Sequence, residues 1–189
     1  MIKKELRSVY KEKRMRFSHS EKTKLDDLLL IQLQQVSLPF VQRLFCYWPI
    51  DQYNEPNTHL FCDFIKFRNP ELLIAYPRIE PATGKMTAII TNEGTSFSRK
   101  AFNVFEPEGN VIMPAGEMDL VIVPMLCFDS KGFRVGYGKG YYDRFLKDCR
   151  KECLKIGFSY FGPVDEITDK HEFDVPLDLC VTPHNTYVF

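Results

Sequence analysis

Residues 119–146, DLVIVPMLCFDSKGFRVGYGKGYYDRFL, decide the fold class of this chain. Their first part, residues 119–123, is a short β-branched run that ends at Pro124, and such a run is typical of a fully buried parallel strand. Their last part has helical character, because Tyr142, Phe145 and Leu146 fall on one face of a helix. A buried strand that leads through a glycine-rich turn into a helix indicates an α/β domain.

Segments on both sides of this stretch alternate between helical and extended patterns. Residues 2–16 have helical spacing with one basic side, and Ser18 with Glu21 forms a capping box that starts a second helix. A third helix is expected around residues 60–65, and the other expected elements are strands at 43–48, 72–76, 153–158 and 179–182 and a hairpin across 78–90 that turns at Gly84. Residues 91–118 are polar and rich in glycine and proline, which indicates an extended active-site loop. This alternation predicts one domain over residues 1–189, with a mostly parallel sheet flanked by helices in a Rossmann-like, open α/β sandwich.

Composition and charge exclude several classes of protein. The 44% hydrophobic content of the 189 residues supplies the core of one compact domain, and 25 basic side chains balance 25 acidic ones. No global field favours nucleic acid or an anionic membrane, so we expect neither as a partner. The longest apolar run, residues 120–128, is far shorter than the roughly 20 residues needed to span a bilayer. The six cysteines show no paired metal-ligand spacing and follow no secretory signal, so we expect reduced thiols in a cytoplasmic protein.

The turn from Gly136 to Gly140 is the strongest candidate for a phosphate-binding site. Alternating glycines let backbone N–H groups approach phosphate oxygens closely, the start of the following helix adds positive potential, and Lys139 adds a full charge. Asp143 could then hold Mg²⁺. The turn is not a Walker A loop, because Gly140 stands where that motif has Ser or Thr, and it is not the dinucleotide fingerprint. A plain strand-to-helix turn is the simpler alternative.

Residues 124–146 resemble the signature segment of the 5-formyltetrahydrofolate cyclo-ligase family, also called methenyltetrahydrofolate synthetase. Similar family positions lie along nearly the whole chain, at KKELR (3–7), EPNT (55–58), Pro77 with Arg78, Glu106 with Pro107, and DVPLDLCVTP (174–183). The family pattern has a glycine a few residues before Glu106, where this chain has Asn103. Because Asn also tolerates a positive φ, we expect the turn at this position to persist.

The resemblance implies a site that combines ATP, folate and a metal. It assigns ATP contacts to Lys3, Lys4, Arg7, Arg134, Gly136, Tyr137, Gly138, Lys139, Gly140, Tyr141 and Tyr142. It assigns substrate contacts to Trp48, Ile50, Glu55, Tyr137, Gly138, Lys139, Gly140 and Tyr141, and it assigns Mg²⁺ to Asp143 and Asp174. Lys139 and Arg7 take the catalytic role, in which they compensate the charge that develops during phosphoryl transfer.

The activity implied by the resemblance is that of a C–N bond-forming ligase. Such an enzyme converts 5-formyltetrahydrofolate to 5,10-methenyltetrahydrofolate and hydrolyses ATP to ADP and phosphate. The implied route transfers the γ-phosphoryl group to the formyl oxygen, after which N10 attacks the formyl carbon. The expected partners are ATP, 5-formyltetrahydrofolate and Mg²⁺, and the expected form is a monomer.

Each assigned residue also has a simpler interpretation. Lys3 and Arg7 could form a solvated basic face, Glu55 a charge at a helix N-terminus, Asp174 a turn residue, and Trp48 part of the core. Two other classes of function also remain open. One is a nucleic-acid-binding module built on the basic N-terminal helix, which the neutral overall charge disfavours. The other is a sugar-phosphate or CoA-handling enzyme on a similar α/β fold, which a resemblance of fold alone does not exclude.

Overall fold

The buried run of residues 120–123 forms the centre of the sheet. In a computed structural model, which describes residues 1–189, this run is strand β7 (Leu120–Val123), and all four of its residues are buried. β7 lies parallel between β1 (Arg43–Phe45) and β10 (Leu154–Phe158). Both faces of β7 are covered, which explains why its sequence is continuously apolar and does not alternate. The predicted buried parallel strand is confirmed.

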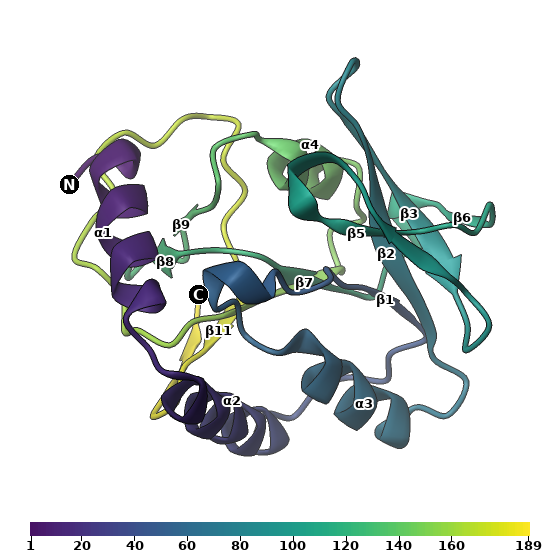
Figure 1. The fold of residues 1–189 in the computed structure, drawn as a ribbon, viewed down its shortest axis with the longest axis horizontal. Helices are drawn as coiled ribbons and strands as arrows, with labels where there is room; N and C mark the ends of the chain where they lie inside the picture. The colour runs from purple at the N-terminus through teal and green to yellow at the C-terminus, as the bar shows by residue number, and fades with distance from the viewer.

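The main sheet has eight strands in the order β12-β11-β10-β7-β1-β2-β3-β6 (Figure 1). Its remaining members are β2 (Leu73–Glu80), β3 (Lys85–Thr91), β6 (Ile112–Met113), β11 (Leu179–Val181) and β12 (Thr186–Val188). The strands from β11 to β2 in this order are parallel to their neighbours, whereas β12, β3 and β6 are antiparallel. The predicted mostly parallel sheet is therefore confirmed.

Helices cover both faces of this sheet. Side chains alternate in direction along β7, so Leu120 and Ile122 belong to one hydrophobic cluster and Val121 and Val123 to another. The helices α2 (His19–Gln34) and α3 (Thr58–Arg68) pack on the first cluster, and α4 (Tyr141–Lys147) packs on the second. Figure 1 shows α2 and α3 together on one side of the sheet and α4 on the other. This is the predicted open α/β sandwich.

The fourth helix, α1 (Lys3–Met15), lies at one end of the molecule (Figure 1). It packs through Leu6 on a small cluster with Val135 and Ile167, next to the hairpin of β8 (Cys127–Phe128) and β9 (Arg134–Val135). The predicted capping box between α1 and α2 is present, with the Ser18 N–H donating to Glu21 Oε2 at 2.8 Å. None of the α-helices is both long and apolar enough to cross a membrane.

Several boundaries differ from the sequence prediction. β1 ends at Phe45, not at residue 48, although the Cys46 N–H still donates to the Ala75 carbonyl of β2 at 2.9 Å. β2 continues through Pro77, because β1 pairs with it only as far as Ala75 and the edge beyond needs no further N–H donor. The predicted turn at Gly84 is confirmed, with φ +70°. Residues 91–118 are not one loop but contain the short strands β4 (Phe97–Arg99), β5 (Phe105–Pro107) and β6 and two 3₁₀ turns, one between β4 and β5 and one after β6.

The strand order places a topological switch point between β1 and β7. From β1 the chain moves to β2 on one side, and from β7 it moves to β10 and β11 on the other. Connections that leave in opposite directions open a crevice at the carboxyl ends of the two strands. The segments that follow β1 and β7 are therefore the first place to look for a binding site.

Candidate active site

A cavity of about 620 Å³ lies at this switch point. Tyr47 and Trp48, which follow β1, and Pro124, which follows β7, contribute to its wall. Every residue that the sequence resemblance assigned to ATP, folate or metal also lines it, namely Lys3, Lys4, Arg7, Trp48, Ile50, Glu55, Arg134, Gly136, Tyr137, Gly138, Lys139, Gly140, Tyr141, Tyr142, Asp143 and Asp174. The structure thus brings together residues from both ends of the chain, whereas their individual roles remain predictions.

The glycine loop, residues 136–140, owes its shape to two positive backbone angles. Gly138 has φ +85° and Gly140 has φ +69°. A Cβ atom on Gly138 would lie 3.1 Å from Cζ of Arg7, and the Arg7 Nε–H donates to the Gly136 carbonyl at 2.9 Å. Position 138 therefore favours glycine for two reasons: glycine adopts the positive φ without strain, and its lack of a Cβ atom leaves room for the Arg7 guanidinium.

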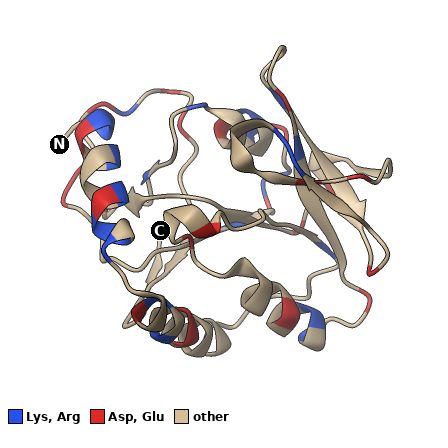
Figure 2. Cartoon of the chain, viewed as in Figure 1, with Lys and Arg blue, Asp and Glu red and all other residues tan.

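Cationic side chains surround this loop. Lys3, Arg7 and Lys11 recur every four residues along α1 and all line the cavity, and Figure 2 shows the blue bands of Lys and Arg on this helix. Lys139 is exposed, and its Nζ lies 5.1 Å from the centre of the Phe102 ring. Because α4 has only seven residues, these side chains, more than the helix dipole, supply the positive potential of the site.

Asp143 is held in place by a buried arginine. Arg134 Nη2 donates to Asp143 Oδ1 at 2.8 Å, and the Val175 N–H donates to the same oxygen at 3.1 Å. Arg134 also donates to the Val175 carbonyl, and burial lowers the pKa of its guanidinium, although the neighbouring Asp143 opposes this. Arg134 thus orients Asp143, while Oδ2 of Asp143 keeps no protein partner.

Asp174, in the segment between β10 and β11, is also held by neighbouring groups. Its Oδ2 accepts hydrogen bonds from Lys3 Nζ and from the His171 N–H, the latter at 2.7 Å. Burial acts to raise the pKa of Asp174, but the His171 N–H and the Lys3 ammonium outweigh it, so the net shift is downward. The carboxylate is therefore ionised at neutral pH, and its Oδ1 is without a protein partner.

Glu55 is buried at the floor of the cavity, with 2% of its surface exposed. The Ile50 N–H donates to Oε2 at 2.7 Å, and the Tyr137 hydroxyl donates to Oε1. Burial raises the pKa of this carboxyl group, and the nearby Arg14 guanidinium partly counteracts the shift. Glu55 is therefore not the solvated helix-terminal charge of the simpler interpretation.

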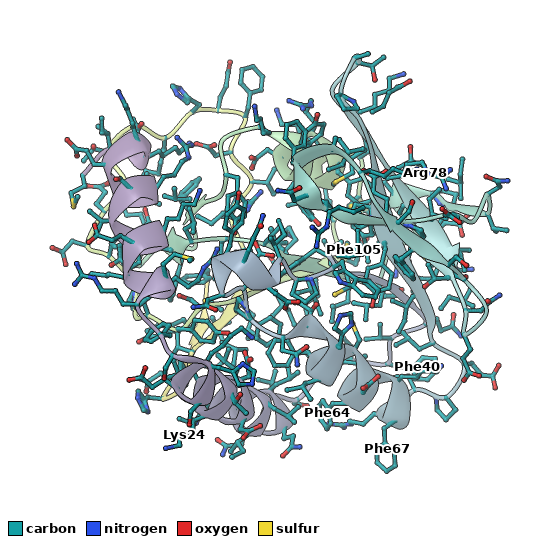
Figure 3. All side chains as sticks on the ribbon, viewed as in Figure 1. Lys24, Phe40, Phe64, Phe67, Arg78 and Phe105 are labelled. Carbon is teal, nitrogen blue, oxygen red and sulfur yellow. The ribbon has the colours of Figure 1, made fainter.

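Trp48 lies in an aromatic wall on the β2–β3 side of the cavity. Its ring centre is 4.5 Å from that of Phe97 and 5.5 Å from that of Phe105. Figure 3 labels Phe105 and Arg78 near the point where β5 passes the β2–β3 hairpin, and the Arg78 guanidinium donates to the Pro107 carbonyl at 2.7 Å. Trp48 is half-buried, so it both packs against the core and lines the cavity.

A turn in residues 101–104 forms another part of the wall. Asn103 has φ +61°, which confirms the expected left-handed turn at this position, and Phe102 has φ +59°. Two successive positive φ angles outside glycine are a strained arrangement. The sequence signalled Asn103 but not Phe102, because phenylalanine has no tendency toward this conformation.

Arg144 ties the glycine loop to the β2–β3 hairpin. Its Nη2 donates to the Gly84 carbonyl at 2.9 Å and to the Lys139 carbonyl at 3.1 Å. Gly84 itself has a positive φ, and Lys139 lies between Gly138 and Gly140, which both have positive φ. The two bonds therefore brace one glycine turn against the other. This brace was not foreseen, because residues 84 and 144 become neighbours only when α4 packs beside β3.

Comparisons with known proteins identify the family of this chain. The model of the 5-formyltetrahydrofolate cyclo-ligase family matches residues 1–183. The 5-formyltetrahydrofolate cyclo-ligase of Mycoplasma pneumoniae is 30% identical over 185 residues, which cover 96% of this chain and 98% of the relative. The corresponding protein of Mycoplasma genitalium is 30% identical over 182 residues, which cover 95% of this chain and 96% of the relative.

Solved structures show the same fold. The NMR structure of Aquifex aeolicus 5,10-methenyltetrahydrofolate synthetase matches with a TM-score of 0.80 at 30% identity, covering 100% of this chain and 93% of that one. A 5,10-methenyltetrahydrofolate synthetase from Mycoplasma pneumoniae matches with a TM-score of 0.74 at 29% identity, covering 96% and 98% of the two chains. These matches confirm the predicted resemblance along nearly the whole chain, which belongs to the 5-formyltetrahydrofolate cyclo-ligase family of enzymes.

Proposed function

We propose that this protein converts 5-formyltetrahydrofolate to 5,10-methenyltetrahydrofolate, with MgATP hydrolysed to ADP and phosphate. The observation that carries the proposal is one cavity of about 620 Å³ in which a cation-lined glycine loop faces a buried carboxylate and an aromatic wall. This volume lies within the roughly 300–1,000 Å³ typical of small-molecule sites. We also propose that the protein acts as a cytoplasmic monomer.

The nucleotide half of the site is the glycine loop with α1. Backbone N–H groups of residues 137–140 would bind phosphate oxygens, and Lys139 with Arg7 would compensate the charge of the transferred phosphoryl group. Lys3 and Lys4 would add positive potential from the first turn of α1. The hydrogen bond from Arg7 to the Gly136 carbonyl supports this assignment, because it positions the guanidinium against the loop.

Asp143 and Asp174 fit the requirements of a magnesium site. Mg²⁺ bound to a nucleotide usually takes one or two protein carboxylates and fills its other positions with phosphate oxygens and water. No group of three or more His, Cys, Asp or Glu side chains is close enough to hold a metal by itself, but each aspartate has one oxygen without a protein partner. When bound, the ion would neutralise phosphate charge during transfer.

The folate half of the site is formed by Glu55 and the aromatic wall. The buried Glu55 carboxylate is suited to accept hydrogen bonds from N–H groups of a folate ring, and Trp48 and Ile50 supply apolar surface beside it. Tyr137 contacts Glu55 from the glycine loop, so the two halves of the site share a wall. A folate seated there would lie next to the phosphates.

The proposed reaction needs little covalent help from the protein. The formyl oxygen attacks the γ-phosphorus, and the bond to the leaving ADP oxygen breaks. N10 then attacks the activated formyl carbon and loses its proton, and phosphate leaves with the former formyl oxygen. The protein holds the formyl oxygen in line with the γ-phosphate and compensates the developing charge, which are the main sources of catalysis in phosphoryl transfer.

A direct assay tests this proposal. Purified protein is mixed with 5-formyltetrahydrofolate and MgATP, and the methenyl product is followed by absorbance. Product is expected only when nucleotide and Mg²⁺ are both present. Product formation without ATP, or none with it, would count against the proposal. The rival sugar-phosphate or CoA enzyme would show no change in melting temperature with MgATP.

A further inference from the structure

Arg14 is the most deeply buried charge of α1, with 2% of its surface exposed. Its Nη1 donates to the Met125 carbonyl at 3.2 Å, and its Nη2 donates to the Tyr137 hydroxyl. The same Nη2 lies 3.9 Å from Glu55 Oε1. Since the Tyr137 hydroxyl donates to that carboxylate oxygen, a continuous chain runs from α1 through the glycine loop to the floor of the cavity.

This arrangement is costly as a purely structural device. A buried ion pair seldom stabilises a fold more than well-packed apolar side chains of similar volume, because both charges lose their hydration. The cost is higher here, since Arg14 Nε is buried without a hydrogen-bond partner. A role in arranging the site explains why a charge stands at this position.

We propose that Arg14 is a positioning residue that fixes Tyr137 of the glycine loop and the Glu55 carboxylate in one arrangement, and so couples nucleotide binding to folate binding. The inference rests on the proposed function, in which the loop binds ATP and Glu55 binds folate. Arg14 does not line the cavity, so in this proposal it acts through Tyr137 and Glu55 and not on a reactant. It acts because its planar guanidinium bonds the hydroxyl that both halves of the site share.

The charges around Glu55 add an electrostatic consequence. Burial raises the pKa of Glu55, while the Arg14 guanidinium is the first of the groups that lower it. The titratable and charged groups that act on Glu55 or respond to it are Arg14, Tyr47, Asp51, Tyr137, Tyr142 and Tyr160. Arg14 is the cation among them, so its removal leaves Glu55 protonated up to a higher pH.

The test compares Arg14→Met, Arg14→Lys, Tyr137→Phe and the Arg14→Met/Tyr137→Phe double variant in the cyclisation assay. Arg14→Met is expected to raise the KM for 5-formyltetrahydrofolate about tenfold and to move the acidic limb of kcat/KM to higher pH. Arg14→Lys keeps the positive charge but not the planar guanidinium. Its acidic limb should therefore match that of the wild type, whereas its KM for 5-formyltetrahydrofolate should stay above the wild-type value. The double variant should lose less than the product of the two single losses, because both substitutions break the same chain.

Arg16→Met is the matched control. Arg16, the C-cap residue of α1, is two residues away, exposed, and paired only with Glu12 of that helix, so its loss should leave KM and the pH profile unchanged. Thermal denaturation of each variant separates folding from function. If Arg14→Met does not fold, Arg14→Lys combined with Tyr137→Phe provides the same additivity test.

The outcomes separate the two claims. If the loss of kcat/KM in the double variant equals the product of the two single losses, or if Arg14→Met does not move the acidic limb, the coupling role is overturned. An active wild-type protein would still uphold the proposed function in that case. A wild-type protein that forms no methenyl product with MgATP would overturn both. Non-additive losses with a shifted acidic limb support the inference.

Discussion

The substitution Gly138→Ala separates the geometry of the glycine loop from its composition. Gly138 has φ +85°, where an alanine costs roughly 1–2 kcal/mol. The new Cβ would also lie 3.1 Å from Arg7 Cζ and 3.2 Å from Arg7 Nε, so the guanidinium must move from its hydrogen bond to the Gly136 carbonyl. A weakened bond to a charged donor adds on the order of 1 kcal/mol, which gives a total of about 2–3 kcal/mol.

Two measurements follow from this magnitude. For a chain of this length, about 2–3 kcal/mol lowers the melting temperature by about 4–12 °C. The displacement of Arg7 from the site should lower kcat/KM for ATP by tenfold or more, because each 1.36 kcal/mol of lost transition-state stabilisation is a factor of about ten. Thermal denaturation and steady-state cyclisation kinetics read the two effects separately.

Gly136→Ala is the matched control for stability. Gly136 has no positive φ, and the nearest atom to its Cβ would be the Pro124 carbonyl oxygen at an ordinary 3.8 Å. Alanine there restricts the unfolded chain and should leave the melting temperature unchanged or slightly higher. Equal melting temperatures for the two variants, or an unchanged kcat/KM for ATP in Gly138→Ala, would refute this account of the loop.

Three further substitutions test separate contacts of the site. Lys139→Ala should lower kcat by about 10²–10³-fold with a stability change within about 0.5 kcal/mol, because Lys139 is exposed; a parallel loss of stability and activity would argue against its catalytic role. Asp174→Asn removes a carboxylate whose pKa in the folded protein is below the ordinary value of 3.8. The stability that this carboxylate contributes is therefore present above pH 3.8 and is lost as the pH falls through the pKa of the folded protein. Melting curves of wild type and variant should therefore differ at pH 7 and converge below 3.8, and a difference that stays constant with pH would contradict the ion pair with Lys3. Arg144→Met breaks the brace to Gly84, so hydrogen exchange of the Gly84 amide, which donates to the Glu80 carbonyl at 2.9 Å, should become faster, whereas protection equal to wild type would show that the brace is dispensable.

The parts of the fold that could be predicted from the sequence are those with strong local signals. β7 was predictable because a continuous apolar run before a proline has few other interpretations, and the capping box at Ser18 because its pattern spans only four residues. β12 was missed, since its three residues are too few to show a period and it forms only because β11 lies beside it.

The candidate site divides in the same way. The glycine loop carries its own signal, because alternating glycines around a lysine between a strand and a helix indicate a turn that can approach an anion closely. Arg14 carries none, since it is one of several basic residues on α1 and its burial depends on Tyr137 and Glu55, which are distant in sequence. The role of Arg134 as the partner of Asp143 was likewise hidden, because it depends on the side-chain geometry between β9 and α4.

A crystal structure with a non-hydrolysable ATP analogue, Mg²⁺ and 5-formyltetrahydrofolate tests the central claim most directly. The account predicts the triphosphate against the backbone N–H groups of residues 137–140 and the Lys139 ammonium, with the formyl oxygen facing the γ-phosphate. A nucleotide bound elsewhere on the protein, with the turn unfilled and the folate far from the phosphates, would contradict it.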